Sequence, residues 1–370
     1  MIYFDNAATS FPKPRCVIRA LNNCVKDYCG NPGRSAHTLS IKSSEKIFET
    51  RSAIASFLNY SSPENVVFTL NASYALNLAI KTTVKPNSHV IISDLEHNSV
   101  IRPLHALKKY GVEYSVFETR NEPEKEIEAL IKNNTSCIIV STTSNVSGEQ
   151  ISIKSLNKIK QKYNLKLIVD ASQNIGHRKI DLKETPVDVL CAPSHKALFG
   201  IQGAGFAVFC DGDMRDSFIE GGSGNESMNS DMPTLLPEHF EAGTLPTPAI
   251  ASLFAGVNYL SEMGISHIEE KLHFLTKEAE SRLMSIKGIK VLGANSGIVS
   301  FVAERVSPHL VAEKLNQNGI AVRSGFHCAP LIHRRLGTLD GGTVRLSLSI
   351  LNNTKELDRF YKVLKSELNI

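Results

Sequence analysis

The sequence predicts an α/β protein in which helices cover a mainly parallel, seven-stranded sheet, followed by a smaller α+β domain. From about residue 64 to residue 210, short β-rich runs alternate with amphipathic stretches, which is the pattern of a parallel sheet covered by helices. The 370 residues also exceed the size at which one core usually stops growing. We therefore expect a large domain over residues 1–250, whose segment 1–14 packs on the other domain, and a small domain over 251–370.

The elements of this sheet can be assigned in order along the chain. Strands are expected at 66–69, 89–93, 112–118, 137–140, 167–169, 187–191 and 205–210. Helices are expected from residue 72 and over 98–109, 122–131 and 153–162, and later over 249–263 and 266–285. The polar, glycine-rich stretch 211–237 is predicted to be a long loop.

Composition excludes several classes of function. The net charge of +4 is small, and no Lys/Arg block is present, which argues against nucleic acid or an anionic membrane as a partner. No apolar run is long enough to cross a bilayer, and residues 1–6 do not resemble a leader. The seven cysteines are scattered without CxxC pairs, which argues against disulfides or structural zinc. We expect a cytoplasmic protein that binds small molecules and copies of itself.

Two residues at predicted strand ends carry most of the chemistry. Lys196 follows the strand at 187–191, and Asp170 follows the strand at 167–169. The carboxyl ends of parallel strands meet at one edge of a sheet, where ligands bind. An amine there can form a Schiff base, and a carboxylate can pair with a pyridinium nitrogen. The pair indicates pyridoxal phosphate, although each residue alone could be a surface charge or a turn former.

Other strand ends supply further groups for such a cofactor. His97 could stack on the ring, and Gln173 could hydrogen-bond the ring oxygen. The helix beginning near Ala72 offers free N–H groups and the Ser73 hydroxyl, which suit a phosphate. The alternative for this segment is a plain helix cap by Asn71 or Ser73.

Several motifs together resemble one family. They are YFDNAAT at 3–9, Glu96-His97, SNVSG at 144–148, DASQ at 170–173, SHK at 194–196, FEAGT at 240–244, VRSGFHCAP at 322–330 and VRLS at 344–347. The chain resembles a class V aminotransferase of fold type I, and specifically the group II cysteine desulfurase and selenocysteine lyase branch. The resemblance runs nearly end to end.

The resemblance implies roles for individual residues. Lys196 would hold pyridoxal 5'-phosphate, Cys328 would attack substrate sulfur, and Lys196 or His97 would move protons. The substrate would be held by Asn145 and Arg345, with Arg323 nearby; an arginine fork suits a carboxylate. The cofactor would contact the following residues: Ala72, Ser73, His97, Asp170, Gln173, Ser194, His195, and Gly243 and Thr244 of a neighbouring subunit.

The cysteine can be weighed without the family. An unpaired cysteine is often a small buried hydrophobe, and a zinc site with His327 and His333 fits no usual spacing. Cys328 lies in a polar segment, and positive charge on Arg323 and His327 would lower a thiol pKa. We therefore predict a reactive thiolate and no metal.

The expected function is a homodimeric desulfurase that converts L-cysteine to L-alanine and passes sulfur to an acceptor protein, as in iron–sulfur cluster assembly. Selenocysteine lyase, another class V lyase or aminotransferase, and a non-catalytic sulfur-carrier partner stay open as alternatives. Two positions depart from the family pattern: Pro193 replaces a hydroxyl residue of the phosphate site, and Tyr74 is unusual in the phosphate helix.

Overall fold

The computed structural model describes residues 1–33, 35–120, 122–213 and 215–368. Residue 214 of the predicted loop and the last two residues of the predicted small domain lie outside this description.

The main sheet has seven strands in the order β2-β8-β7-β6-β5-β3-β4, and every pairing is parallel except those made by β8. The predicted fold class is confirmed. The strands are β2 (Val66–Thr69), β3 (His89–Ser93), β4 (Glu113–Phe117), β5 (Thr135–Ser141), β6 (Lys166–Asp170), β7 (Val189–Pro193) and β8 (Gly205–Phe209).

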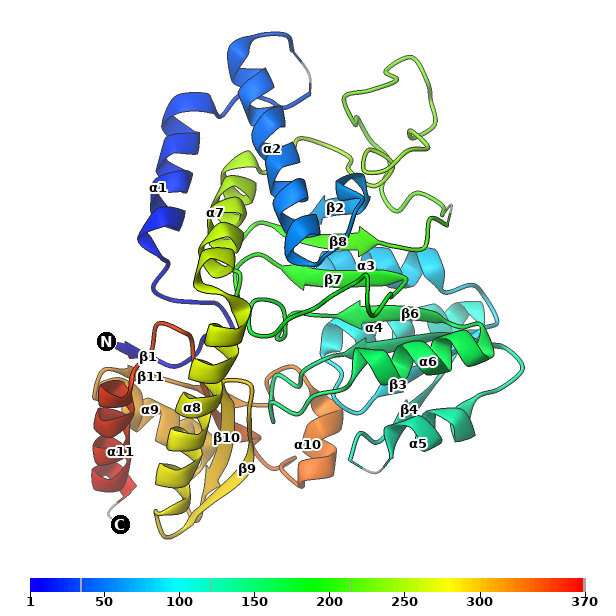
Figure 1. Ribbon diagram of the computed structural model, residues 1–370. Coiled ribbons are helices and arrows are strands. Elements are labelled where there is room, and N and C mark those ends of the chain that lie inside the picture. Colours follow the sequence, from blue (N-terminus) through cyan, green and yellow to red (C-terminus); the bar gives the residue numbers. More distant parts are fainter. Residues whose placement is uncertain (34, 121, 214, 369–370) are drawn as a thin grey trace.

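Both faces of this sheet are buried, which explains its continuous apolar runs. On β3, Val90 and Ile92 belong to a hydrophobic cluster with α3 and α4, whereas Ile91 belongs to a cluster with α2, α6 and α7. Figure 1 shows helices on the two sides of the sheet. The covering helices are α2 (Thr38–Phe57), α3 (Ala72–Thr83), α4 (Asn98–Leu107), α5 (Pro123–Leu130), α6 (Ile153–Tyr163) and α7 (Thr247–Met263).

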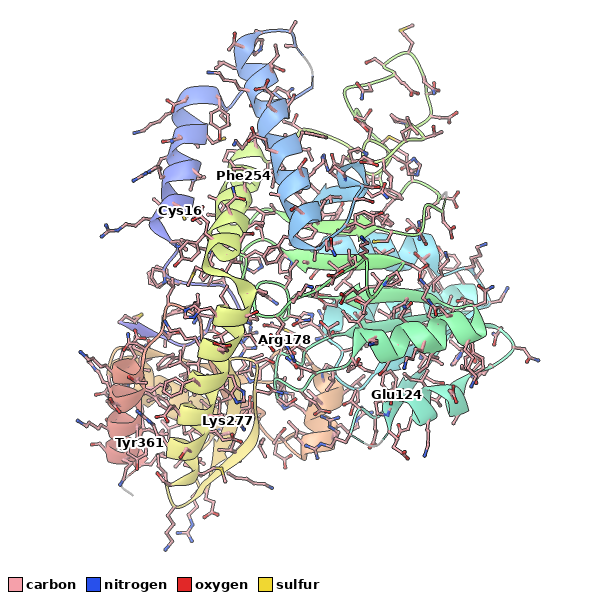
Figure 2. The ribbon with its side chains drawn as sticks, viewed as in Figure 1. Cys16, Glu124, Arg178, Phe254, Lys277 and Tyr361 are labelled. Carbon is pink, nitrogen blue, oxygen red and sulfur yellow. The ribbon has the colours of Figure 1, made fainter. Side chains whose placement is uncertain are left out.

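The helices α4 to α8 begin and end within two residues of the bounds predicted from the sequence. The sequence pattern did not predict α1 (Arg15–Asn23), the π-helical turn η1 (Cys24–Tyr28) or α2. Both helices pack on α7, and Figure 2 shows Cys16 of α1 close to Phe254 of α7. Short 3₁₀ turns, η2 (Pro63–Asn65) and η3 (Lys108–Tyr110), precede β2 and follow α4.

A second, antiparallel sheet lies toward the C-terminus in the order β12-β13-β10-β9. Its strands are β9 (Ile289–Asn295), β10 (Ile298–Ala303), β12 (Arg323–Gly325) and β13 (Thr343–Ser347). It packs with α8 (Ile265–Met284) and α9 (Pro308–Gln317), and these contact α11 (Thr354–Leu368), while α10 (Pro330–Leu336) follows β12. Residue 250 lies inside α7, so the domain boundary there stays a prediction.

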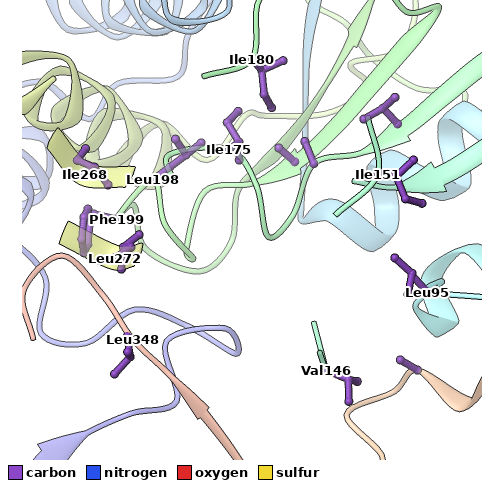
Figure 3. Close-up of a cluster of buried hydrophobic side chains, with 14 of the residues drawn as sticks. Leu95, Val146, Ile151, Ile175, Ile180, Leu198, Phe199, Ile268, Leu272 and Leu348 are labelled. Atoms are coloured by element: carbon purple, nitrogen blue, oxygen red, sulfur yellow. The ribbon is translucent and has the colours of Figure 1, made fainter. Parts of the chain in front are cut away.

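The N-terminal segment joins the C-terminal part of the chain. Strand β1 (Ile2–Tyr3) pairs in parallel with β11 (Ile320–Ala321), and Asp5 bridges to Ser347 of β13. One hydrophobic cluster runs through both parts: in Figure 3, Leu198 and Phe199 lie near Ile268 and Leu272 of α8. The two sheets are thus joined by a continuous core, and the edge between them is where the polar motifs meet.

The stretch between β8 and α7 contains no helix or strand among its described residues, in agreement with the predicted loop. Phe240 stacks on Phe209 of β8 with ring centroids 4.9 Å apart, and a buried ion pair joins Arg215 to Asp211 over 2.5 Å. These contacts attach the loop to the sheet. No helix in the described part of the chain is long and apolar enough to cross a membrane.

Candidate active site

A cavity of about 610 Å³ lies at the carboxyl ends of the parallel strands. It is lined by most of the residues singled out from the sequence, which come from both sheets and from the N-terminal segment. They are Ala72, Ser73, His97, Asn145, Asp170, Gln173, His195, Lys196, Arg323 and Arg345. The fold therefore brings these side chains together, while the predicted residues Ser194, Gly243, Thr244 and Cys328 lie outside the lining.

Lys196 stands in the turn after β7, and its surroundings favour a neutral amine. Burial lowers the pKa of Lys196 to about 8, and the cations Arg345 and Arg323 act in the same direction, while Asp170 opposes them. Since the unprotonated amine is the nucleophile, a larger fraction of Lys196 is reactive near neutral pH than of an ordinary lysine.

Asp170 ends β6 and is 5% exposed. Its Oδ1 accepts a hydrogen bond from the Ser172 N–H over 2.9 Å, which fixes the carboxylate at the cavity wall. Gln173, one turn further on, donates from Nε2 to the Ala7 carbonyl over 3.0 Å. This bond holds the N-terminal segment against the site.

His97 caps α4 with its ring. Its Nδ1 accepts a hydrogen bond from the Ser99 N–H over 3.0 Å, so the proton of the neutral ring lies on Nε2. Burial lowers the pKa of His97 to about 4, although Asp170 acts against this shift. The ring is therefore an uncharged plane at neutral pH.

The N-terminus of α3 forms the other end of the cavity. Asn71 accepts the Tyr74 N–H through Oδ1 over 3.0 Å, which leaves the first N–H groups of the helix facing the cavity at Ala72 and Ser73. Strand β8 passes close by: a Cβ on Gly205 would lie 2.6 Å from the Asn71 carbonyl carbon. Only glycine permits this approach of the strand to the helix start.

Pro193 and Tyr74, the two residues that depart from the family pattern, lie in different surroundings. Pro193 lines the cavity, and Tyr74 makes an edge-on ring contact with Phe218 of the long loop at 5.7 Å. The Ser194 hydroxyl donates to the Ile201 carbonyl over 2.5 Å. Its predicted contact with the cofactor stays a prediction.

The 240–244 segment lies beside a different hollow. Gly243 lines a cavity of about 400 Å³ together with Arg51 and Glu241, and Thr244 is exposed. Neither residue lines the main cavity of its own chain. Their predicted contact with the phosphate of a neighbouring subunit stays a prediction.

Arg345 of β13 also lines the cavity and is 1% exposed. Its Nη1 donates to the Asn145 carbonyl over 2.9 Å, and its Nη2 donates to Asp5 Oδ1 over 2.7 Å. The Arg345 Nε and the Asn145 Oδ1 are buried without a hydrogen-bond partner. Unpaired buried polar atoms of this kind are rare in proteins and mark a place for a polar ligand.

Cys328 lies on the surface beside the cavity. It is exposed, and its φ of +58° follows a φ of +48° at His327, which are strained values for residues other than glycine. Asn145 Nδ2 donates to the His327 carbonyl over 2.7 Å, so the strained turn is fixed from the cavity side. His327 itself lines the cavity.

One expectation about this cysteine is wrong. We expected His327 to be a positive neighbour of the thiol, but burial, with help from Arg345, His333 and Arg323, lowers the pKa of His327 to about 2. The ring is 3% exposed and bonds Thr343 through Nε2 over 3.0 Å. His327 is therefore neutral, and Arg323 is the remaining expected cation.

Comparison with known proteins identifies the family. Residues 2–360 match the model of a family described as aminotransferase class-V. The chain belongs to the class V aminotransferase family. Enzymes of this family generally use pyridoxal phosphate, and the relatives found are named as cysteine desulfurases.

Two relatives and one solved structure show the extent of the similarity. The chain is 33% identical to a probable cysteine desulfurase from Methanothermobacter thermautotrophicus, over 96% of this chain and 92% of that protein. It is 32% identical to a probable cysteine desulfurase from Pyrococcus abyssi, over 99% and 94%. The apo structure of cysteine desulfurase from Thermococcus onnurineus NA1 matches with a TM-score of 0.91 at 30% identity, over 100% and 94%.

The residues present in this class V chain fit pyridoxal phosphate. An amine, a carboxylate and a neutral aromatic ring converge at Lys196, Asp170 and His97, and the start of α3 offers N–H groups for a phosphate. His195 Nδ1 is buried without a partner. This donor set agrees with the use of that cofactor in the family.

Some members of the site were not predicted from the sequence. Thr143 lines the cavity with a buried, unpartnered Oγ1, and Gln202 and Gly203 line it from the β7–β8 connection. The position of Thr143, two residues after the end of β5, could have indicated it from the sequence. Asp5 carries no such local signal, because its contact with Arg345 joins residues 340 positions apart.

Proposed function

We propose that this chain is a pyridoxal 5'-phosphate-dependent cysteine desulfurase, which converts L-cysteine to L-alanine and leaves the sulfur on Cys328 as a persulfide. The observation that carries the proposal is the convergence of Lys196, Asp170 and Arg345 on one cavity, beside a turn that presents an exposed cysteine. The relatives of the chain are named for this activity.

The cofactor would be held by groups from both ends of the cavity. Lys196 would attach it covalently, Asp170 would pair with the ring nitrogen, and His97 would lie against the ring. Gln173, His195, Ala72 and Ser73 would supply further polar contacts. When bound, pyridoxal phosphate supplies an electron sink for the α-carbon of the substrate.

The substrate would be oriented through its carboxylate. Arg345 has an unpartnered Nε–H, and Asn145 has an unpartnered amide oxygen, so a carboxylate and an ammonium group would satisfy atoms that otherwise lack partners. Arg323 adds positive charge to the same wall. Once freed from the cofactor, the amine of Lys196 is suited to move protons at the α-carbon, because its pKa lies near 8.

Cys328 would take up the sulfur of the substrate. Its Sγ would attack the substrate sulfur as a thiolate, forming the S–S bond while the C–S bond of the substrate breaks. The electron pair of the C–S bond stays with the carbon skeleton, which takes up a proton and leaves as L-alanine. The persulfide at an exposed position can then pass to an acceptor protein, such as one that serves iron–sulfur cluster assembly.

Assembly and location complete the proposal. The exposed Gly243 and Thr244 would reach the phosphate site of a second copy, so the active form would be a homodimer. The described cysteines are all unpaired, which suits a reducing compartment such as the cytoplasm.

The test uses purified protein supplied with pyridoxal phosphate, L-cysteine and a reductant, and it measures alanine and sulfide. We expect equal amounts of both. Cys328→Ala should abolish sulfide release while keeping the visible absorption of the bound cofactor, and Cys16→Ala, another exposed cysteine, should change neither. Turnover of selenocysteine or another amino acid without alanine from cysteine would support the other class V activities instead.

Cofactor attachment is tested separately. Borohydride reduction of the holoenzyme should add the cofactor mass to the peptide that contains Lys196, and Lys196→Ala should remove that mass. A colourless wild-type protein that gains no mass would contradict the enzyme proposal and favour a non-catalytic sulfur carrier.

A further inference from the structure

Asp5 forms an ion pair with Arg345, whose side chain lines the cavity. Its Oδ1 accepts a hydrogen bond from Arg345 Nη2 over 2.7 Å, and the Asp5 side chain is 21% exposed while that of Arg345 is 1% exposed. A buried guanidinium without an anion is strongly unfavourable. Asp5 therefore neutralises Arg345 when no ligand is present.

The backbone around Asp5 is held independently of this ion pair. Ala7 N–H donates to Ser347 Oγ over 2.9 Å, and Asn6 Nδ2 donates to the Ser347 carbonyl over 2.9 Å. Asp5 also forms a backbone bridge with Ser347. The carboxylate is thus placed behind Arg345 by β13 and the N-terminal segment, and the ion pair is not needed to hold the chain there.

The Arg345 guanidinium is not fully paired within the chain. Arg345 lines the cavity, whereas Asp5 is not among the lining residues. The Nε of Arg345 has no hydrogen-bond partner. A ligand carboxylate that binds Arg345 while Asp5 stays at Nη2 would place two anions against one cation.

The cavity lining carries other charges as well. Arg323 and Lys196 are the further cations of the lining, and Asp170 is its acidic residue. Asp5 acts on Lys196 as well, since it opposes the lowering of the Lys196 pKa. The charge of Asp5 is therefore felt by the groups that would meet the substrate.

We propose that Asp5 is the internal counter-ion of the carboxylate-binding Arg345, and that it weakens the binding of amino-acid carboxylates so that the product can leave. The inference rests on the proposed function, in which Arg345 binds the substrate carboxylate. Asp5 is a positioning and affinity-setting residue, because it acts through Arg345 and does not line the cavity.

The test compares two ligands of the holoenzyme by calorimetry. L-Alanine carries a carboxylate, and ethylamine is the same molecule without it. Asp5→Asn keeps an oxygen acceptor for Arg345 but removes the charge, so we expect L-alanine to bind about tenfold more tightly, since loss of one like charge commonly shifts such an equilibrium by about one decade. The affinity for ethylamine should stay within about twofold. The KM for L-cysteine should fall together with the Kd for L-alanine, and kcat should not rise.

The control is Asp211→Asn, which removes the acid of another buried ion pair, with Arg215, outside the cavity lining. It should leave the ratio of the two affinities unchanged. Asp5→Ser, which keeps a hydroxyl acceptor, should act as Asp5→Asn does and serves if the asparagine variant does not fold. Unchanged or weaker alanine binding in a folded Asp5 variant overturns the proposal and makes Asp5 an anchor only.

Arg345→Met separates this inference from the function on which it rests. If Arg345→Met loses the preference for L-alanine over ethylamine while Asp5→Asn has no effect, only the role of Asp5 is overturned. If Arg345→Met keeps that preference, Arg345 does not bind the carboxylate, and both the substrate assignment and the role of Asp5 fail.

Discussion

The backbone N–H of Asn98 donates a hydrogen bond to the carbonyl of Cys328 over 2.7 Å. Asn98 is the first residue of α4 and directly follows His97. The turn that presents Cys328, the proposed sulfur nucleophile, is therefore attached to the helix capped by His97, the proposed ring-stacking residue. The bond joins α4, which covers the main sheet, to the turn that follows β12 of the second sheet, so the position of Cys328 depends on how α4 is placed.

Asn98→Pro should slow sulfur transfer by removing this donor. Proline is well tolerated at the first helical position, and His97 already has a φ of −74° and ψ of 156°, which suit a residue before proline. A single hydrogen bond contributes about 0.5–1.5 kcal/mol, so we expect a loss of roughly two- to tenfold in the single-turnover rate of alanine formation. Cofactor affinity, measured by fluorescence titration, should stay the same.

Asn98→Ala is the matched control for the proline variant, because it keeps the N–H and changes only the side chain. It should retain the wild-type rate. Equal rates for the two variants would mean that the bond does not position Cys328.

Lys196 should become reactive over an unusual pH range in the cofactor-free protein. Its pKa is lowered to about 8, mainly by burial, and only the unprotonated amine reacts with an aldehyde. The rate of reductive methylation of Lys196, followed by peptide mass spectrometry, should rise with pH and reach half its maximum near pH 8. Lys179, whose pKa is raised by Asp181, should react only at higher pH. Parallel profiles for the two lysines would contradict the shift.

Much of the site was predictable because parallel strands end at one edge. His97, Asn145 and Lys196 each follow a strand of the same sheet and Asp170 ends one, so local sequence patterns suffice to bring them together. The ion pair of Asp5 with Arg345 was not predictable, because it depends on how the N-terminal segment packs against β13.

Burial explains the other differences between prediction and structure. The charge expected on His327 is lost because the ring is nearly inaccessible to water. Helix α2 was missed because its sequence is polar over much of its length, and its buried residues only meet their partners on α7 after folding. Both features depend on tertiary contacts and carry no local signal.

Glu96 should make the stability of the protein fall as pH rises. Its carboxyl is fully buried, and burial raises its pKa to about 8, against hydrogen bonds from Ser93 and Ser141. Between pH 4.5 and 8 the unfolded chain releases this proton but the folded chain keeps it. The free energy of unfolding therefore decreases with pH over this window, by up to about 1.4 kcal/mol per pH unit from this group.

Glu96→Gln removes the titrating group at almost constant shape. The variant should gain stability relative to the wild type between pH 5.5 and pH 7.5, measured by urea unfolding at both values. If the difference between the two proteins is the same at both pH values, Glu96 is not protonated in the folded state.

Arg51 of α2 and Glu241 of the 240–244 segment form a buried ion pair. Two hydrogen bonds join them, at 2.8 Å and 2.5 Å, each side chain is 6% exposed, and Glu241 also accepts the Phe68 N–H over 2.6 Å. Glu241→Ala leaves the Arg51 charge buried without an acidic partner, so we expect a loss of about 3–5 kcal/mol in the free energy of unfolding, measured by urea denaturation.

The double variant Arg51→Met/Glu241→Leu should recover most of this loss, because neither charge is then buried. Glu113→Ala, which breaks the exposed pair with Lys132, should cost no more than about 1 kcal/mol. If the single and double variants of the buried pair are equally unstable, the loss comes from packing and not from the unpaired charge.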